Sequence, residues 1–303
     1  MPNPGRQHPL RPSSALKLEK HLPRQIAETL FFEGCAQMAD GRSAEAEASF
    51  RHACELCPDF GEAQANLGLL LEQRGENTAA EAAYRRALAL DIHSPQLFLN
   101  LGALLAATRR FAEAEAVYGR GLSLAPDSAA LWSNLGVLLA CQKHEDKARA
   151  CYAAALSSDE NHASARFNLA YLLLRQGDLQ AGFACLEARD WYAAFARELG
   201  EKRAIPRWQG EPVQGKALLI VCEAGHGDMI QFCRYAVELK RRGAARVEVL
   251  CHPALVRLFA SLDGADAIHT LGAPLPGQRW DFWSPPLSLP HFCDTRSVSY
   301  THL

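Results

Sequence analysis

One asparagine recurs along the chain at a fixed spacing of 34 residues. The four positions are Asn66, Asn100, Asn134 and Asn168. A primary amide offers a hydrogen-bond donor and an acceptor together, so it can pair with the backbone of an extended peptide whatever the peptide's side chains are. We therefore predict that these four amides form an asparagine ladder that binds a polypeptide. The alternative is that each asparagine bonds locally between neighbouring helices.

A second candidate for chemistry is the loop 223–228, with the sequence EAGHGD. Gly225 and Gly227 allow a tight turn and a close approach of the backbone to a ligand. Asp228 stands where a helix is predicted to begin, so its carboxylate could simply cap the N–H groups of the first turn. The loop is not a dinucleotide-binding fingerprint, because G-x-G-x-x-G is incomplete and no acidic residue ends the following strand.

The asparagines lie in segments that repeat with the same period. Three copies begin at residues 65, 99 and 133 with ANLGLLLEQRG, LNLGALLAATR and SNLGVLLACQK. Each copy has a glycine and an alanine where two helices must approach closely, and an aromatic residue four positions after the alanine, on the same helical face. These residues are Gly68, Gly102, Gly136, Ala80, Ala114, Ala148, Tyr84, Tyr118 and Tyr152. The period and pattern are typical of tetratricopeptide repeats.

Two further copies flank these three. An earlier one fits through Gly34, Ala46, Phe50, Ala53 and Pro58. A later one, FNLAYLLLRQGDLQAGFACLEARDW, keeps its first helix but drifts in its second. We predict a disordered tail over 1–26, then four repeats and a degenerate fifth over 27–196. Such an array is an α-α superhelix whose concave face, lined by the first helix of each pair, is expected to bind a protein or peptide.

The pattern changes after residue 215. Apolar runs KALLIVC, RVEVLC and ADAIHT alternate with helical stretches, which is typical of a parallel sheet built from βαβ units. In doubly wound sheets ligands bind outside the carboxyl ends of the strands. The loop 223–228 directly follows the first predicted strand, so it lies at the expected position of a site. We predict a linker over 197–215 and a partial Rossmann-like α/β domain over 216–296.

The stretches GDLQAGFACLEARDW, PRWQGEPVQGKALLIVCEAGHGD and SPPLSLPHF closely resemble bacterial tetratricopeptide proteins with a C-terminal GT-B glycosyltransferase-like domain, akin to the lipopolysaccharide heptosyltransferases. The repeats also resemble those of O-GlcNAc transferases, in which an asparagine ladder holds the acceptor polypeptide. The resemblance implies an inverting enzyme that transfers a sugar from a nucleotide-sugar donor to a protein acceptor, without a bound cofactor or metal.

The same resemblance implies roles for the loop residues. Its G-D pair carries the carboxylate that would deprotonate the acceptor hydroxyl, and the matching residue is Asp228. His226 is an alternative base or acceptor contact. The expected substrate-binding residues are Glu223, Gly225, Gly227 and Gln231. The family loop usually reads like E-Q-G-L-G-D, so Ala224 and His226 depart from it. The competing hypothesis is a non-enzymatic scaffold whose C-terminal domain is a degenerate relative.

Composition limits the partners. The chain has 303 residues with 32 basic and 34 acidic side chains, and a net charge of -2 does not indicate a basic surface for binding nucleic acid. No window approaches a membrane span and no signal peptide is recognisable, so we expect a cytoplasmic bacterial protein with ten reduced cysteines. The one C-x-x-C, Cys54 to Cys57, lacks a second pair of metal ligands. We therefore expect these cysteines to be small buried apolar side chains and not a zinc or redox site.

The final residues fit no expected element. VSYTHL back-translates to the transposase mosaic-end sequence used in sequencing-library adapters. We therefore expect residues 297–303 to be translated adapter on a truncated gene fragment. A GT-B enzyme binds its nucleotide sugar mainly in a second Rossmann-like half, so we expect this polypeptide itself not to turn over.

Overall fold

The computed structural model describes residues 14–296 except 91–93, 191, 224 and 278, with side chains from Leu22 onward except that of Lys202. The adapter prediction for 297–303 therefore lies outside the described residues. The chain divides into two compact units, Met1–Gln142 and Lys143–Leu303. Of the helices that the structure describes, none is both long and apolar enough to cross a membrane.

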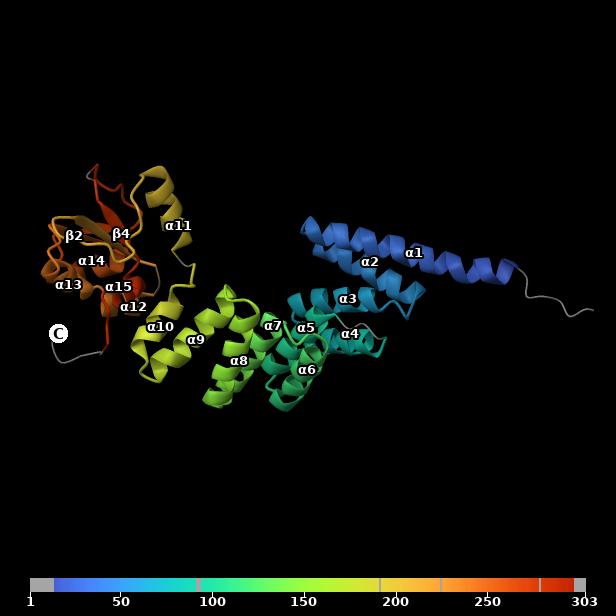
Figure 1. The fold of residues 1–303 in the computed structure, drawn as a ribbon. Helices are drawn as coiled ribbons and strands as arrows, with labels where there is room; N and C mark the ends of the chain where they lie inside the picture. The colour runs from blue at the N-terminus through green and yellow to red at the C-terminus, as the bar shows by residue number, and fades with distance from the viewer. Residues whose placement is uncertain (1–13, 91–93, 191, 224, 278, 297–303) are drawn as a thin grey trace, which may run out of the picture. The chain divides into compact units, whose positions relative to one another are not determined.

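The first unit consists of antiparallel helix pairs (Figure 1). The helices are α1 (Ser14–Ala39), α2 (Ser43–Leu56), α3 (Gly61–Gln73), α4 (Asn77–Ala89), α5 (Pro95–Ala107), α6 (Phe111–Leu124) and α7 (Ala129–Cys141). A residue with positive φ lies in the turn inside each pair, at 34-residue intervals. Gly41 and Gly75 hold this position at 76° and 81°, whereas Arg109 adopts it at 61° without the freedom of glycine.

An aromatic ring of the second helix packs directly on a glycine of the first helix in these pairs. A Cβ atom added to Gly68 would lie 2.7 Å from the Tyr84 ring, and one added to Gly34 would lie 2.7 Å from the Phe50 ring. Ala80 is fully buried in the same contact layer. The predicted close approach of the two helices is therefore confirmed, and it is the aromatic side chain that requires it.

The predicted tail 1–26 is wrong in its second half, because α1 begins at Ser14. Pro23 lies inside this helix and does not end it. The helix is held by tertiary contacts: Ala27 is fully buried against Phe60, and the guanidinium of Arg24 lies 4.4 Å from the centre of the Phe60 ring. Packing against the next helix pair thus outweighs the helix-breaking tendency of Pro23.

The second unit starts with α8 (Glu145–Ser158), α9 (Ala163–Arg175) and α10 (Leu179–Leu186), followed by α11 (Ala193–Phe195) and a π-helix, Ala196–Lys202. Its strands are β1 (Ala217–Val221), β2 (Arg246–Cys251), β3 (Ala267–Thr270) and β4 (Phe282–Ser284). Between and after them lie α12 (His226–Phe232), α13 (Tyr235–Arg241), α14 (Pro253–Phe259), a 3-10 turn Pro286–Ser288 and α15 (Leu289–Phe292).

The four strands form one parallel sheet in the order β3-β2-β1-β4. The three strands expected from the apolar runs are confirmed. The edge strand β4 was not predicted, because its three residues are too few to show a period. Val221 pairs with Leu250 on one side of β1, and Leu219 pairs with Trp283 on the other.

Both faces of the sheet are covered by apolar side chains. On one face, Leu218 and Ile220 pack with residues of α12, α13 and α14, and with Phe183 and Leu186 of α10. On the other face, Leu219 and Val221 pack with Leu199 of the π-helix and with two tryptophans, Trp280 and Trp283. The segment 197–215, which we expected to be a linker, is therefore a packed layer of the α/β unit.

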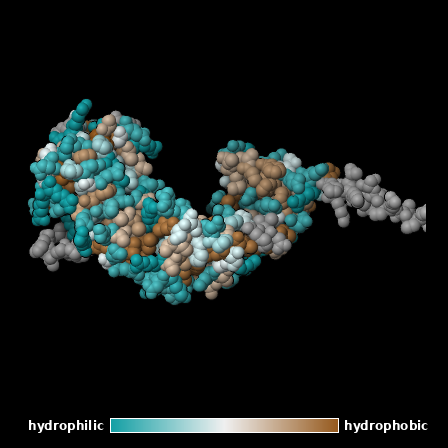
Figure 2. Space-filling model, in the orientation of Figure 1, coloured by the Kyte–Doolittle hydropathy of each residue, from teal (hydrophilic) through white to brown (hydrophobic). Residues whose placement is uncertain are grey.

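Hydrophilic residues cover much of the face shown in Figure 2, with apolar ones interspersed along the repeats. The large exposed apolar side chains include Phe32 at 69% and Leu22 at 60% in α1, and Val137 at 37% in α7. Apolar residues scattered in this way are normal on a folded protein and do not by themselves define a binding surface.

Candidate functional site

The sheet has a topological switch point between β1 and β4. From β1 the chain crosses to β2 and then β3 on one side, whereas β4 pairs on the other side. Ligands of doubly wound sheets bind outside the carboxyl ends of the strands at such a point. Here those ends lead into Glu223, two residues after β1, and into the turn Pro286–Ser288 after β4.

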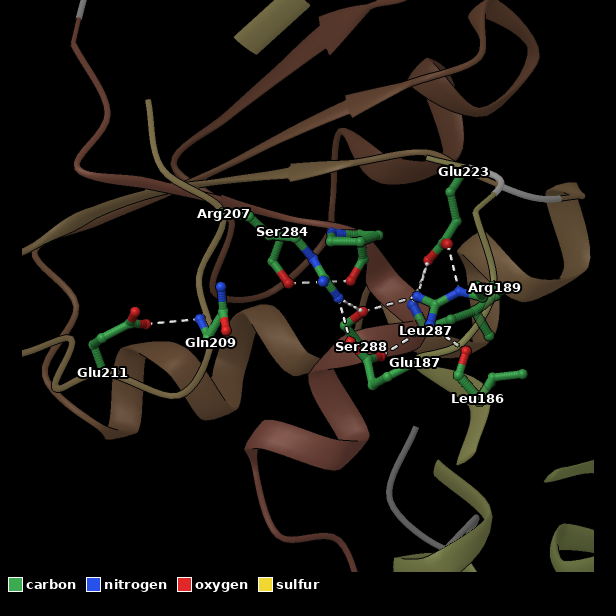
Figure 3. Close-up of polar contacts among 11 residues, drawn as sticks. Leu186, Glu187, Arg189, Arg207, Gln209, Glu211, Glu223, Ser284, Leu287 and Ser288 are labelled. Atoms are coloured by element: carbon green, nitrogen blue, oxygen red, sulfur yellow. Dashed lines mark hydrogen bonds and ion pairs between the residues drawn. The ribbon is translucent and has the colours of Figure 1, made fainter. Parts of the chain in front are cut away.

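A buried ion pair occupies this position (Figure 3). Arg189, which follows α10, donates from Nε to Oε2 of Glu223 at 2.7 Å and from Nη2 to Oε1 at 2.8 Å. Both side chains are 0% exposed. Burial opposes the guanidinium charge, but the hydrogen bonds to Glu223 and its negative charge outweigh it and raise the pKa of Arg189. The two-pronged geometry is the strongest form of this interaction.

Three more residues complete what we call the Arg189 network: Glu187, Arg207 and Ser288. Arg189 also donates to Glu187 Oε1 at 2.9 Å, to the Leu186 carbonyl at 3.0 Å and to Ser288 Oγ at 2.8 Å. Arg207 donates to Ser288 Oγ at 2.9 Å and pairs with Glu187. The network joins the last repeat to the loops after β1 and β4.

Glu223 therefore has partners other than the substrate contact that we predicted. Its Oε1 also accepts the backbone N–H of Leu287 at 2.9 Å, so both carboxylate oxygens are engaged inside the protein. Sequence reasoning missed Arg189 and Ser288, because they lie 34 and 65 residues from Glu223 and no local pattern marks them. In this structure Glu223 positions the loop after β1.

Asp228 lies in the first turn of α12, beside the last repeat. The helix begins after Gly225, which is its N-cap, so Asp228 is not the capping residue. Burial raises the pKa of Tyr171 in α9, and the nearby charge of Asp228 raises it further. Tyr171 lies three residues after Asn168, on the same face of α9. The structure thus brings the candidate base next to the helix that carries the last amide of the ladder.

His226 meets a second histidine that the sequence did not single out. Its ring centre lies 4.6 Å from that of His252, with the rings at 80° to each other. His252 directly follows β2 and caps α14, where its Nδ1 accepts the N–H of Ala254 at 3.2 Å. Gln231 is exposed on α12. A Cβ added to Gly227 would touch nothing within 4 Å, so open space remains beside this loop.

Metal-binding groups are not gathered in the part of the chain that the structure describes. Nowhere among those residues do three or more His, Cys, Asp or Glu side chains lie close enough to hold a metal ion. The C-x-x-C cysteines are both free, Cys57 is buried, and burial raises the pKa of Cys54 to about 11. A thiol with such a pKa is a poor nucleophile and a poor redox centre at neutral pH.

The asparagines of the first unit bond to neighbouring helices. Asn66 donates to Cys35 Sγ at 3.6 Å. Asn100 hydrogen-bonds to the Tyr84 hydroxyl and accepts from Gln96 at 2.7 Å. Asn134 makes the equivalent contact with the Tyr118 hydroxyl. The local bonding that we kept as an alternative is therefore present, while each amide stays only half-buried. Asn168 lies in α9 of the second unit and is also half-buried.

Comparison with known proteins identifies the class. Two sequence models of the tetratricopeptide repeat match the chain, one over residues 33–95 and 144–199 and the other over 95–138. The predicted repeats are thus confirmed. The chain belongs to the tetratricopeptide-repeat proteins. No curated protein matches it.

Solved structures agree on the fold of the repeats. PilW, described as a widely conserved type IV pilus biogenesis factor, is 20% identical with a TM-score of 0.51, over 59% of this chain and 89% of PilW. PilF of Pseudomonas aeruginosa is 20% identical with a TM-score of 0.50, over 60% of this chain and 94% of that one. At these identities the likeness concerns the fold alone.

Proposed function

We propose that the protein binds an extended polypeptide through the first helices of its repeats. The observation that carries this proposal is the recurrence of a half-buried amide at one position of three successive repeats, Asn66, Asn100 and Asn134. Three residues further on, one turn along the same face, Ala103 and Val137 are exposed. In these two repeats the amide therefore lies beside exposed surface.

The amides keep hydrogen-bonding capacity for a ligand. The Tyr84 hydroxyl donates to Glu72 at 2.7 Å, so its contact with Asn100 uses one N–H of the amide. Gln96 uses one lone pair of the carbonyl oxygen. A primary amide has two N–H groups and two lone pairs, so one of each remains for the backbone of a bound peptide. Local hydrogen bonding then orients the amide without using all of its donors and acceptors.

The test separates these two roles of the amide. Replacing Asn100 and Asn134 together by Ala is expected to weaken binding of an extended peptide by about tenfold per lost hydrogen bond. The matched control is Tyr84→Phe, which removes only the local partner and is expected to leave affinity within about twofold. Equal loss in both variants, at unchanged helix content by circular dichroism, would show that the amides act only between helices.

A second proposal concerns the α/β unit. The parallel sheet with its switch point, and the position of Asp228 beside Tyr171 of α9, favour a glycosyltransferase-like site of the GT-B kind. A peptide hydroxyl bound along α9 would reach Asp228 as general base, and a nucleotide sugar would be the donor. No bound cofactor is required. In the Arg189 network Glu223 would hold the loop in place.

Transfer of labelled sugar from a panel of nucleotide sugars to a peptide tests this second proposal in the protein that the gene encodes. We expect Asp228→Asn to abolish transfer while peptide affinity stays unchanged. The matched control is Asp263→Asn, away from the carboxyl edge of β1. Transfer at the wild-type rate by Asp228→Asn would refute the role of Asp228. Absence of transfer from every nucleotide sugar would leave the scaffold function alone.

A further inference from the structure

A pocket of about 230 Å³ opens between α5, α6 and α7 of the first unit. Its wall includes Ala103, Ala106, Phe111, Tyr118, Asn134 and Val137. One of the ladder amides therefore lies at the edge of a cavity. The lining contains no acidic side chain. The cavity is large enough for one side chain of a bound peptide.

Two residues that line the pocket are smaller than their counterparts one repeat earlier: Ala106 replaces Glu72, and Ala103 replaces Leu69. Glu72 of α3 reaches the Tyr84 hydroxyl, which donates to it at 2.7 Å. The residue 34 positions later is Ala106, and its methyl group leaves the corresponding space beside Tyr118 empty. The two repeats otherwise share the tyrosine, the glycine beneath its ring and the asparagine of the next helix. Glu72 therefore shows what fits beside this tyrosine.

The Tyr118 hydroxyl lacks the acceptor that Tyr84 has. Tyr118 is 2% exposed, and burial raises its pKa to about 12. The contact with the Asn134 amide lowers the pKa and opposes this effect of burial. Among the described residues, no carboxylate accepts from the Tyr118 hydroxyl as Glu72 accepts from Tyr84. A carboxylate that enters the pocket can accept from this hydroxyl, as Glu72 accepts from Tyr84.

We propose that this pocket binds a glutamate side chain of the peptide held by the repeats, so that the partner supplies the carboxylate that Glu72 supplies within the chain. The inference rests on the proposed peptide binding. A carboxylate accepts only, and the pocket is lined by the Tyr118 hydroxyl and the Asn134 amide, both of which can donate. The walls formed by Phe111 and Val137 would pack against the methylene groups.

Fluorescence polarisation with the full chain tests the proposal. The probes are four labelled Gly-Ser peptides that differ at one central position, which is Glu, Gln, Leu or Lys. We expect the Glu peptide to bind at least tenfold more tightly than the Leu and Lys peptides. Ala106→Glu should fill the pocket, bond to Tyr118 and remove this preference without loss of thermal stability. Tyr118→Phe should weaken the Glu peptide by about tenfold.

The reverse substitution is the matched control. Glu72→Ala opens the equivalent space beside Tyr84, and we expect a second binding site for the Glu peptide, seen as a doubled stoichiometry. Peptides that bind the wild type without a preference for Glu would overturn this inference and leave the proposed peptide binding intact. A Glu preference that persists in Ala106→Glu would also overturn it. If none of the four peptides binds, the proposed function fails, and this inference fails with it.

Discussion

Replacement of Arg189 by Met should destabilise the second unit severely. The substitution removes five hydrogen bonds and leaves Glu223 fully buried without a counter-ion. Breaking a buried pair by removing one partner costs about 3 to 5 kcal/mol. Only the N–H of Leu287 would still bond to Glu223, so we expect a value near the middle of that range, about 4 kcal/mol. This is a large part of the stability of an ordinary domain.

The two partners should also be coupled. In Glu223→Gln, Arg189 keeps Glu187 and Ser288, so we expect a smaller loss of about 2 kcal/mol. In the double variant Arg189→Met/Glu223→Gln no charge is left unpaired, and the loss should fall short of the sum by at least about 2 kcal/mol. Arg241→Met, at a site 76% exposed, is the control and should change stability by less than about 0.5 kcal/mol.

Denaturant unfolding followed by tryptophan fluorescence measures these differences, because four of the five tryptophans lie in the second unit. A loss of unfolding free energy below about 1 kcal/mol for Arg189→Met would refute the reasoning, since burying an unpaired carboxylate costs more than that. Strict additivity in the double variant would refute it as well, because it would show that the two side chains do not stabilise each other.

Three further predictions concern the repeats. Arg109→Gly should raise the melting temperature of the first unit by relieving a left-handed backbone, a gain of about 0.5 kcal/mol, whereas Gly75→Ala should lose about 1 kcal/mol. Gly68→Ala should cost about 1 to 3 kcal/mol in urea unfolding through overlap with an aromatic ring, but Gly119→Ala, with open space, should cost nothing. Burial opposes ionisation of Glu47, yet its two arginine partners outweigh burial and lower the pKa of the carboxyl group. The ion pairs of Glu47 therefore stabilise the fold above the unfolded-state pKa, and this stabilisation is lost on acidification. Glu47→Gln should cost about 1 kcal/mol at pH 7 and nothing at pH 3.

The period of the sequence was sufficient to predict the helix pairs and the place of their tight contacts. Positions such as Gly68 and Tyr84 recur every 34 residues because each repeat packs its two helices in the same way. One sequence therefore shows the same packing pattern several times. Three of the four strands could also be predicted: β1 is a run of five apolar residues, and β2 and β3 are shorter apolar stretches, interrupted by Glu248 and His269, that alternate with helical segments. A three-residue edge strand carries no such signal.

The Arg189 network could not be predicted in the same way. Arg189 contacts Glu223 and Ser288 across 34 and 99 residues, and nothing local distinguishes it from the many other arginines. The local partners of Asn100 and Asn134 could have been predicted from the sequence, because a tyrosine lies 16 residues before each of them. Aligning Glu72 with Ala106 would likewise have indicated a vacancy beside Tyr118.

Helices α9 and α10 share their core with the sheet, and this affects how the protein can be divided for expression. A fragment that ends at residue 196, where the repeat pattern fades, would expose Phe183 and Leu186 to water. It would also leave Arg189 without Glu223 and Ser288. Such a fragment is expected to aggregate or to lose its last helix pair, so α9 and α10 should be expressed together with the strands.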